Sequence, residues 1–194
     1  MKIHISIVTI FSFLLCSCEE NVLDRTIFIP DKKYPELPAY TEWGYNSFGA
    51  FYEKNKFIVT DNIVPCNIIY NNGILDFLLT GKCFGKEMTL TFSFPLSEVK
   101  TIYDLSILHN LTLNLTENCT VKLEENNTQS TLEVLSGQLH FKRFQLLRVD
   151  EKENRIILSG TFDVKFLKNG LPETIWEGRF DMGITDRDFY SYAK

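Results

Sequence analysis

Histidine is scarce in this 194-residue chain, which holds three of them. His4 lies near the N-terminus, and His109 and His140 are alone in their neighbourhoods, so no metal-ligand spacing and no catalytic histidine pair can be assembled. P-loop, Rossmann, nucleophile-elbow and EF-hand motifs are also missing. The sequence therefore predicts no catalytic residue, no metal ligand and no cofactor. His140 falls between Gln138 and Lys142 on the polar side of a strand, where we expect a solvated side chain.

Clusters of basic residues are missing as well. The chain carries 20 Lys and Arg against 25 Asp and Glu, for a net charge of −5 and a pI of about 5.3. No stretch concentrates the positive charge that nucleic-acid binding requires, so we expect no nucleic-acid partner. Apolar residues make up 44% of the chain and aromatic residues 13%. This composition excludes general disorder and is sufficient for the core of one domain of ordinary size.

The body of the chain has three cysteines, Cys66, Cys83 and Cys119. A turn at Asn72-Gly73 would pair Cys66 near Leu79, about 13 Å along the strand from Cys83, so this hairpin conflicts with a Cys66–Cys83 disulfide. A nucleophilic cysteine needs a neighbouring base, and the sequence offers none. Whether the three cysteines form any disulfide is left open by the sequence.

The N-terminus has the pattern of a secretory signal. Lys2 and His4 precede an apolar run from Ile5 to Leu15. As a helix this run would rise only about 16 Å, roughly half of a bilayer core, so it is too short to span a membrane. Residues 1–17 are therefore predicted to be a signal peptide.

The apolar run ends in Leu15-Cys16-Ser17-Cys18, which resembles the lipobox of bacterial lipoproteins. A lipobox has a Leu three residues before the lipidated Cys and a small residue just before it. Cys18 fits this pattern, whereas Cys16 would have Leu15 in the small-residue place. The resemblance implies lipid attachment at Cys18 and hence anchoring to a membrane, for which more than one acyl chain is needed. An ordinary signal peptide that ends near two cysteines is the alternative.

Glu19 and Glu20 follow the predicted lipidation site directly. Acidic residues in this place resemble a surface-export signal of Bacteroidetes lipoproteins, which implies an outer membrane lipoprotein exposed at the cell surface. Two acidic residues in a solvated tether at the periplasmic face are the alternative.

Residues 18–42 are predicted to form the lipidated tether. Pro30, Pro35 and Pro38 lie there among charged residues, and proline favours extended chain without donors for a sheet. The apolar run Ile27-Phe28-Ile29 is the exception, because it could lie along the domain as an edge strand.

A repeated pattern near the C-terminus predicts a β-hairpin. Gly160–Val164 and Gly178–Met182 both read Gly-x-Phe-Asp-apolar, and an Asn169-Gly170 turn lies between them. Each run has one apolar and one charged face, as in an antiparallel sheet that covers a core on one side. The glycines lie on the apolar face, where we expect them to make room for neighbouring aromatic rings.

The register of this hairpin is constrained by its faces. A two-residue loop alone would place Glu177 opposite Phe162, on the buried side. We therefore expect a bulge or an odd-length loop that brings Phe162 opposite Trp176 or Gly178 instead.

Alternating runs recur through the rest of the chain, most cleanly at Met88–Phe94 and Leu111–Leu115. Only Ser97–Leu108 is a candidate helix, with Ser97 as N-cap and Val99, Ile102 and Tyr103 on one side. The predicted fold is all-β: an antiparallel β-sandwich or flattened barrel of about ten strands with at most one short helix, formed by residues 43–194 as a single domain.

Three further motifs carry a family resemblance: Phe48-Gly49-Ala50, Ser159–Phe162 and Glu177–Asp181. With the lipobox and the short stalk, they resemble a loose family of uncharacterised lipoproteins from gut Bacteroidetes. A short Asn-Gly turn usually follows Phe-Gly-Ala there, whereas this chain has Glu53-Lys54-Asn55. The resemblance implies a β-sandwich at the cell envelope and brings no known activity.

Aromatic residues are the candidates for binding, because their faces stack on sugars and on partner side chains. Trp43 and Tyr45 are the predicted ligand-binding residues, and Phe189, Tyr190 and Tyr192 form a second aromatic group. Trp43 and Tyr45 could instead cap the end of the core.

Three hypotheses for the function follow. The first is a non-enzymatic, lipid-anchored module that binds a glycan or a protein partner. The alternatives are a lipocalin-like carrier with an apolar ligand in its interior and a hydrolase with an unrecognised site.

Asp163 and Asp181 are the pair that would suggest a glycosidase. In the two allowed registers they are offset by four or six residues on paired strands, about 13 to 20 Å, whereas glycosidase carboxylates lie about 5 to 9.5 Å apart. Both fall on the charged outer face, so we expect structural roles, with water, Lys165 or Arg179 as partners.

We predict that Cys18 is the acylated residue. Labelled fatty acid should enter the wild-type protein and be lost in Cys18→Ala, because Ser17 supplies the small residue that the lipobox needs. Retention of the label in Cys18→Ala, or its loss in Cys16→Ala alone, would contradict the assignment.

Overall fold

The computed structural model describes residues 25–60, 64–149 and 152–192. Cys18 and the other residues of the predicted signal peptide and lipobox lie outside these ranges. Within them, no helix has the length and apolar character needed to cross a membrane.

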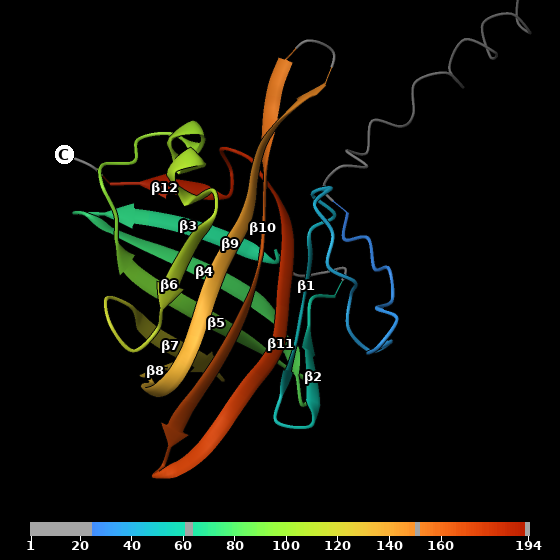
Figure 1. The fold of residues 1–194 in the computed structure, drawn as a ribbon, viewed down its shortest axis with the longest axis vertical. Coiled ribbons are helices and arrows are strands. Elements are labelled where there is room, and N and C mark those ends of the chain that lie inside the picture. The colour runs from blue at the N-terminus through green and yellow to red at the C-terminus, as the bar shows by residue number, and fades with distance from the viewer. Residues whose placement is uncertain (1–24, 61–63, 150–151, 193–194) are drawn as a thin grey trace, which may run out of the picture.

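Twelve strands and one short 3-10 helix make up the described chain (Figure 1). The strands are β1 (Ser47–Tyr52), β2 (Asn55–Ile58), β3 (Cys66–Asn71), β4 (Ile74–Cys83), β5 (Lys86–Pro95), β6 (Leu111–Asn114), β7 (Thr120–Glu125), β8 (Thr128–Thr131), β9 (Glu133–Val149), β10 (Lys152–Lys168), β11 (Leu171–Ile184) and β12 (Phe189–Ser191). The helix, η3, spans Ile102–Leu108.

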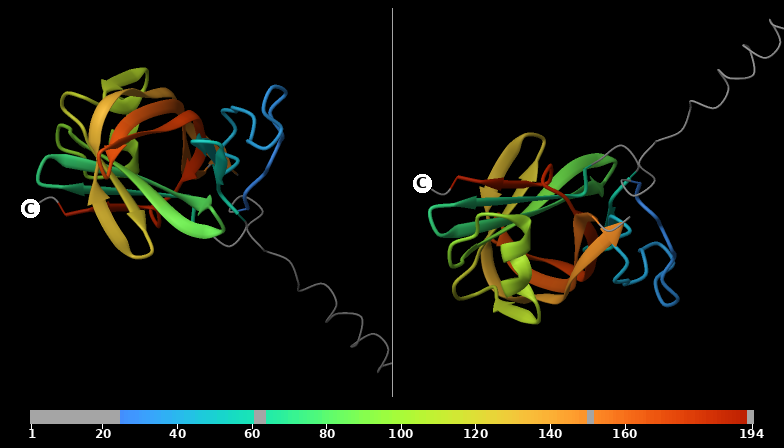
Figure 2. Two further views of the ribbon diagram at one scale, coloured as in Figure 1. Left: turned by 90° about the horizontal axis from the view of Figure 1, so that it is seen from below. Right: turned by 90° about the horizontal axis from the view of Figure 1, so that it is seen from above.

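All twelve strands belong to one sheet, whose main path runs β6-β9-β10-β11-β1-β2-β4-β5-β7-β8. Neighbours on this path are antiparallel, while β12 pairs with β3 in parallel. The sheet curls strongly, so that the layer of β3, β4 and β5 faces the layer of β9, β10 and β11 (Figure 2). The predicted all-β fold, a sandwich or flattened barrel with one short helix, is confirmed.

The β10–β11 hairpin has the expected bulge. Its turn is the two-residue Asn169-Gly170, because Lys168 pairs with Leu171, and the register shifts by one between Val164↔Ile175 and Phe162↔Gly178. Glu177, at the bulge, has a φ of 52°. The extra residue places Gly178 rather than a carboxylate opposite Phe162, which is one of the two expected pairings.

The two glycines of the repeated pattern make room for the two phenylalanines. A Cβ on Gly178 would lie 2.6 Å from the Phe162 ring, and a Cβ on Gly160 would lie 2.6 Å from the Phe180 ring. Each copy of the pattern therefore provides the space for the aromatic ring of the other copy, as expected from the sequence.

These two rings also join the layers of the sheet. The Phe180 ring lies 4.9 Å from that of Phe77 on β4 and 5.7 Å from that of Phe141 on β9, between ring centroids. The Phe162 ring lies 5.4 Å from that of Phe92 on β5. The barrel interior is thus packed with aromatic rings that contact one another across it.

A polar cluster joins the layers at the hairpin end of the barrel. The Nζ of Lys168 on β10 lies 2.7 Å from a carboxylate oxygen of Glu125 on β7 and donates to the Tyr52 hydroxyl at 3.0 Å. The Tyr52 hydroxyl donates in turn to Glu173. Burial and the hydrogen bond to Glu173 raise the pKa of Tyr52, which holds it as a neutral donor.

The described part of the predicted tether packs against the outer faces of β1 and β11. The Tyr34 ring makes edge contacts with the rings of Phe51 and Trp176, which stack on each other at 4.8 Å. Leu37 is fully buried, and a Cβ on Gly49 would collide with Pro38. Residues 26–45, here called the N-terminal strap, therefore form a second apolar layer outside the barrel, although their proline content had suggested a free stalk.

The strap has its own hydrogen bonds. The Ile27 amide donates to the Tyr45 carbonyl, the Ala39 amide donates to the Ile29 carbonyl, and the Asp31 carboxylate accepts from the amides of Lys33 and Tyr34. These amides lower the pKa of Asp31, with burial opposing them and Arg179 reinforcing them. The Ile27–Ile29 run lies along the domain, as its sequence allowed. It is hydrogen-bonded to residues 39–45 of the strap and is not an edge strand of the sheet.

The predicted helix is shorter than expected and begins later. Its cap is Thr101 rather than Ser97, and the Asp104 carboxylate accepts hydrogen bonds from the amides of Lys100 and Thr101. Tyr103 is 40% exposed, so it does not share the buried side with Ile102 as predicted.

The predicted pairing of Cys66 with Leu79 is confirmed, and the open question of a disulfide is answered by three free cysteines. Cys66 pairs with Leu79 on β4, and Cys66, Cys83 and Cys119 are all free thiols. Burial raises the pKa of each of these thiols, to about 11 for Cys83 and Cys119, so none is an activated nucleophile.

Phe162→Ala and Phe180→Ala should each lower the free energy of unfolding by about 3 to 5 kcal/mol, because each removes a buried ring from between the layers. Urea denaturation measures the effect. The matched control is Leu171→Ala in the same hairpin, where the side chain is 68% exposed and the change should stay within about 0.5 kcal/mol. Alanine variants as stable as the wild type would contradict the assignment of the faces.

Candidate functional site

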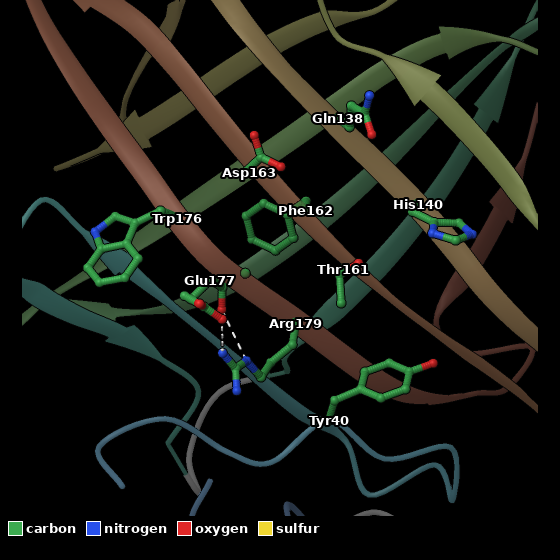
Figure 3. A pocket seen from close by; sticks show the side chains of 10 residues that line it. Tyr40, Gln138, His140, Thr161, Phe162, Asp163, Trp176, Glu177 and Arg179 are labelled. Atoms are coloured by element: carbon green, nitrogen blue, oxygen red, sulfur yellow. Dashed lines mark hydrogen bonds and ion pairs between the residues drawn. The ribbon is translucent and has the colours of Figure 1, made fainter. Parts of the chain in front are cut away.

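A groove with a volume of about 570 Å³ lies on the outer face of β9, β10 and β11 (Figure 3). Its residues come from these three strands and from the strap. They are Tyr40, Gln138, His140, Thr161, Phe162, Asp163, Trp176, Glu177, Gly178 and Arg179. The volume is within the range of small-molecule binding sites in proteins.

The sheet register fixes the floor of the groove. Thr161 on β10 is paired with His140 on β9 and with Arg179 on β11, and Asp163 is paired with Gln138. Because strand side chains alternate, these residues point outward while Phe162 between them points into the core. The floor therefore presents a hydroxyl, an amide, an imidazole and a carboxylate side by side.

Tyr40 of the strap forms one side of the groove. Its hydroxyl donates to Glu42 at 2.9 Å and lies 3.3 Å from the Ser159 hydroxyl, while the Lys142 ammonium lies 4.6 Å from the ring centroid. Burial raises the pKa of Tyr40 to about 12. These contacts fix the orientation of the ring before any ligand arrives.

Trp176 forms the opposite side, next to the bulge (Figure 3). Its ring stacks on Phe51, and its indole nitrogen donates to the Glu53 carbonyl at 2.8 Å. Tyr40 and Trp176, the aromatic residues at the two sides of the groove, are therefore both held by neighbours outside it.

The charged side chains of the groove differ in whether they form ion pairs within the described ranges. Arg179 is nearly buried and lies 2.7 Å from Glu177 and 3.0 Å from Asp31, and Lys33 lies 3.6 Å from Glu177. Asp163 has no ion pair or side-chain hydrogen bond with any residue in the described ranges. Partial burial alone raises its pKa above the ordinary value of 3.8. Asp163 is thus the carboxylate of the groove that is open to a ligand.

Asp181, at the matching place in the second copy of the pattern, has the opposite environment. It is 1% exposed, and its carboxylate accepts hydrogen bonds from the Thr41 hydroxyl and from the amides of Trp43, Gly44 and Tyr45 at 3.0, 2.8 and 3.3 Å. The prediction that it lies on an exposed face with water, Lys165 or Arg179 as partner was wrong, because the strap covers β11 there. Its structural role is instead to fasten the strap.

The two aspartates are far apart along the hairpin. Ser159 is the residue opposite Asp181, so Asp163 and Asp181 are offset by four residues along paired strands, or about 13 Å, as one expected register required. Of the two, only Asp163 lines the groove, while the Asp181 carboxylate accepts hydrogen bonds from the strap. Within the described ranges, no group of three or more His, Cys, Asp or Glu side chains could hold a metal ion.

The predicted ligand-binding residues Trp43 and Tyr45 lie outside the groove. Trp43 is 69% exposed and does not cap the core, whereas Tyr45 is half-buried. Of the second aromatic group, Phe189 packs against the core, while Tyr190 and Tyr192 are exposed beside β3.

Sequence reasoning missed the groove itself. Tyr40 lay in the expected tether, Trp176 was considered as a possible partner of Phe162 across the hairpin, and His140 was read as a solvated residue. In the sequence, Gln138 and His140 alternate along one strand, and Thr161 and Asp163 alternate along another. The β9–β10 register brings these four residues together, so the groove could have been found only with that register known.

Comparison with known proteins places the chain in no family, since no family model, curated protein or solved structure matches it. The groove must therefore be interpreted from its own chemistry.

Asp181→Asn should lower the free energy of unfolding by about 1.5 to 3 kcal/mol, because an amide group would face backbone donors that now meet a carboxylate. Asp163→Asn is the matched control at the same place in the other copy. It should change stability by no more than about 0.5 kcal/mol at neutral pH, since burial already disfavours the charged form. Equal losses in the two variants would contradict the division of roles between the aspartates.

Proposed function

We propose that the protein is a lipid-anchored cell-envelope module that binds a glycan in the groove on β9, β10 and β11. The observation that carries this proposal is the unpaired Asp163 carboxylate, which lies beside the polar side chains of Gln138, His140 and Thr161. It also lies between Tyr40 and Trp176, whose rings are held by hydrogen bonds to neighbours. The chain would be held to the outer membrane by lipid on Cys18, either at the cell surface or on the periplasmic face.

The lining of the groove suits a sugar. Hydroxyl groups both donate and accept hydrogen bonds, so Asp163 can accept from them while Gln138, His140 and Thr161 can do either. The C–H faces of a pyranose ring pack against aromatic side chains, for which Tyr40 and Trp176 are suitably placed at the edges.

The carboxylates in and near the groove favour binding of a glycan without its hydrolysis. A glycosidase needs a second carboxylate near the first. Glu177 is engaged by Arg179 and Lys33, and Asp181 by the strap, so neither is available as a partner for Asp163. A carrier of an apolar ligand is disfavoured because aromatic rings occupy the barrel interior.

The proposal is tested by screening the full-length lipoprotein, solubilised in detergent, on an array of polysaccharides and oligosaccharides, followed by calorimetric titration of any ligand found. Asp163→Asn and Tyr40→Ala should each weaken binding at least tenfold, the first through lost acceptor strength and the second through lost packing. The control is Asp186→Asn, which lies in the exposed β11–β12 connection outside the groove. No glycan on the array, or a glycan whose affinity none of the groove variants changes, would contradict the proposal.

Binding should also weaken as the pH falls. Ionised Asp163 is the stronger acceptor, and its raised pKa means that it takes up a proton at a higher pH than an ordinary aspartate. Affinity should therefore fall as the pH passes down through the Asp163 pKa in the wild-type protein, and this fall should be missing in Asp163→Asn, whose profile shows only what the other groups of the groove contribute. A wild-type profile that parallels that of Asp163→Asn would show that the Asp163 carboxylate does not contact the ligand.

A further inference from the structure

Four large apolar side chains of the strap are exposed to solvent. Ile27, Phe28 and Ile29 are 41%, 42% and 42% exposed, and Trp43 is 69% exposed. Exposed large apolar side chains that gather on one part of a domain surface mark an interaction surface.

The four side chains lie on two adjacent backbone segments. The Ile27 amide donates to the Tyr45 carbonyl at 2.8 Å, and the Ala39 amide donates to the Ile29 carbonyl. The run from Ile27 to Ile29 is therefore bonded alongside residues 39–45, the segment that contains Trp43. The backbone of this segment is itself held by Asp181 through the amide of Trp43.

The chain that precedes the patch sets its distance from the predicted anchor. Ile27 follows Cys18 by nine residues, which extend over at most about 30 Å. Acyl chains on Cys18 would therefore keep the patch within reach of the bilayer surface at all times. Tryptophan and large aliphatic side chains are the residues that favour the membrane interface.

We propose that Ile27, Phe28, Ile29 and Trp43 form a membrane-contact patch, which rests on the bilayer that holds the lipid of Cys18. The inference depends on the proposed lipid anchor and is independent of glycan binding. Its consequence is that the domain lies against the membrane in one fixed orientation, instead of moving freely at the end of a flexible stalk.

Tryptophan fluorescence gives a direct test, because the chain contains two tryptophans. Trp43 belongs to the patch, whereas Trp176 stacks on Phe51, contacts the Tyr34 ring and forms one side of the groove. The full-length lipoprotein and its Trp43→Phe variant are reconstituted into phosphatidylethanolamine and phosphatidylglycerol vesicles, with or without lipids brominated on the acyl chains. The difference between the two proteins gives the emission of Trp43 without altering Trp176.

Brominated lipids should reduce the Trp43 emission at least twofold and leave the Trp176 emission, measured in Trp43→Phe, unchanged. Phe28→Ser should reduce this quenching while the protein still floats with the vesicles. Flotation with an unquenched Trp43 that is accessible to aqueous iodide would overturn the patch alone. Failure of the wild-type protein to float would overturn the lipid anchor and the patch together, and would leave glycan binding untouched.

Discussion

The buried carboxylate of Asp181 is the interaction on which the arrangement of the outer surface depends. A charge that is 1% exposed is stable only where donors replace the lost water, and here the Thr41 hydroxyl and three consecutive amides do so. These donors belong to the strap, so burying the charge and fastening the strap are one event. Tyr40, which forms one side of the groove, is placed by the same contact.

Beneath this surface, the β10–β11 hairpin organises the core. Each copy of the Gly-x-Phe-Asp pattern contributes a ring to the interior and a glycine that makes room for the ring of the other copy. The bulge at Glu177 allows this exchange, because it restores the alternation of faces that a two-residue turn would otherwise disturb. The two copies then differ in what covers them: β11 lies next to β1 and under the strap, whereas β10 lies between β9 and β11. That difference makes Asp181 structural and leaves Asp163 open to a ligand.

Features of the fold that depend on residues close together in the sequence could be predicted, whereas those that depend on contacts between distant residues could not. Alternation, turn residues and the repeated pattern are local, and from them the all-β class, the bulged hairpin, the pairing of Cys66 with Leu79 and the role of the glycines were correctly predicted. The strap was not, because its contact with Asp181 joins residues 138 positions apart and its composition is that of a linker. The groove was missed for the same reason, since Tyr40 and the residues of β9 and β10 meet only once the strap and the register are in place.

Amide hydrogen exchange of the strap tests this account most directly. If Asp181 fastens the strap to β11, the amides of Trp43, Gly44 and Tyr45 should be protected to a degree close to that of the β11 core in the wild-type protein, and should exchange much faster in Asp181→Asn while the amides of β4 and β5 keep their protection. Rapid exchange of these three amides in the wild-type protein, at the rate of an unstructured chain, would show that the segment is a free tether and would contradict the account.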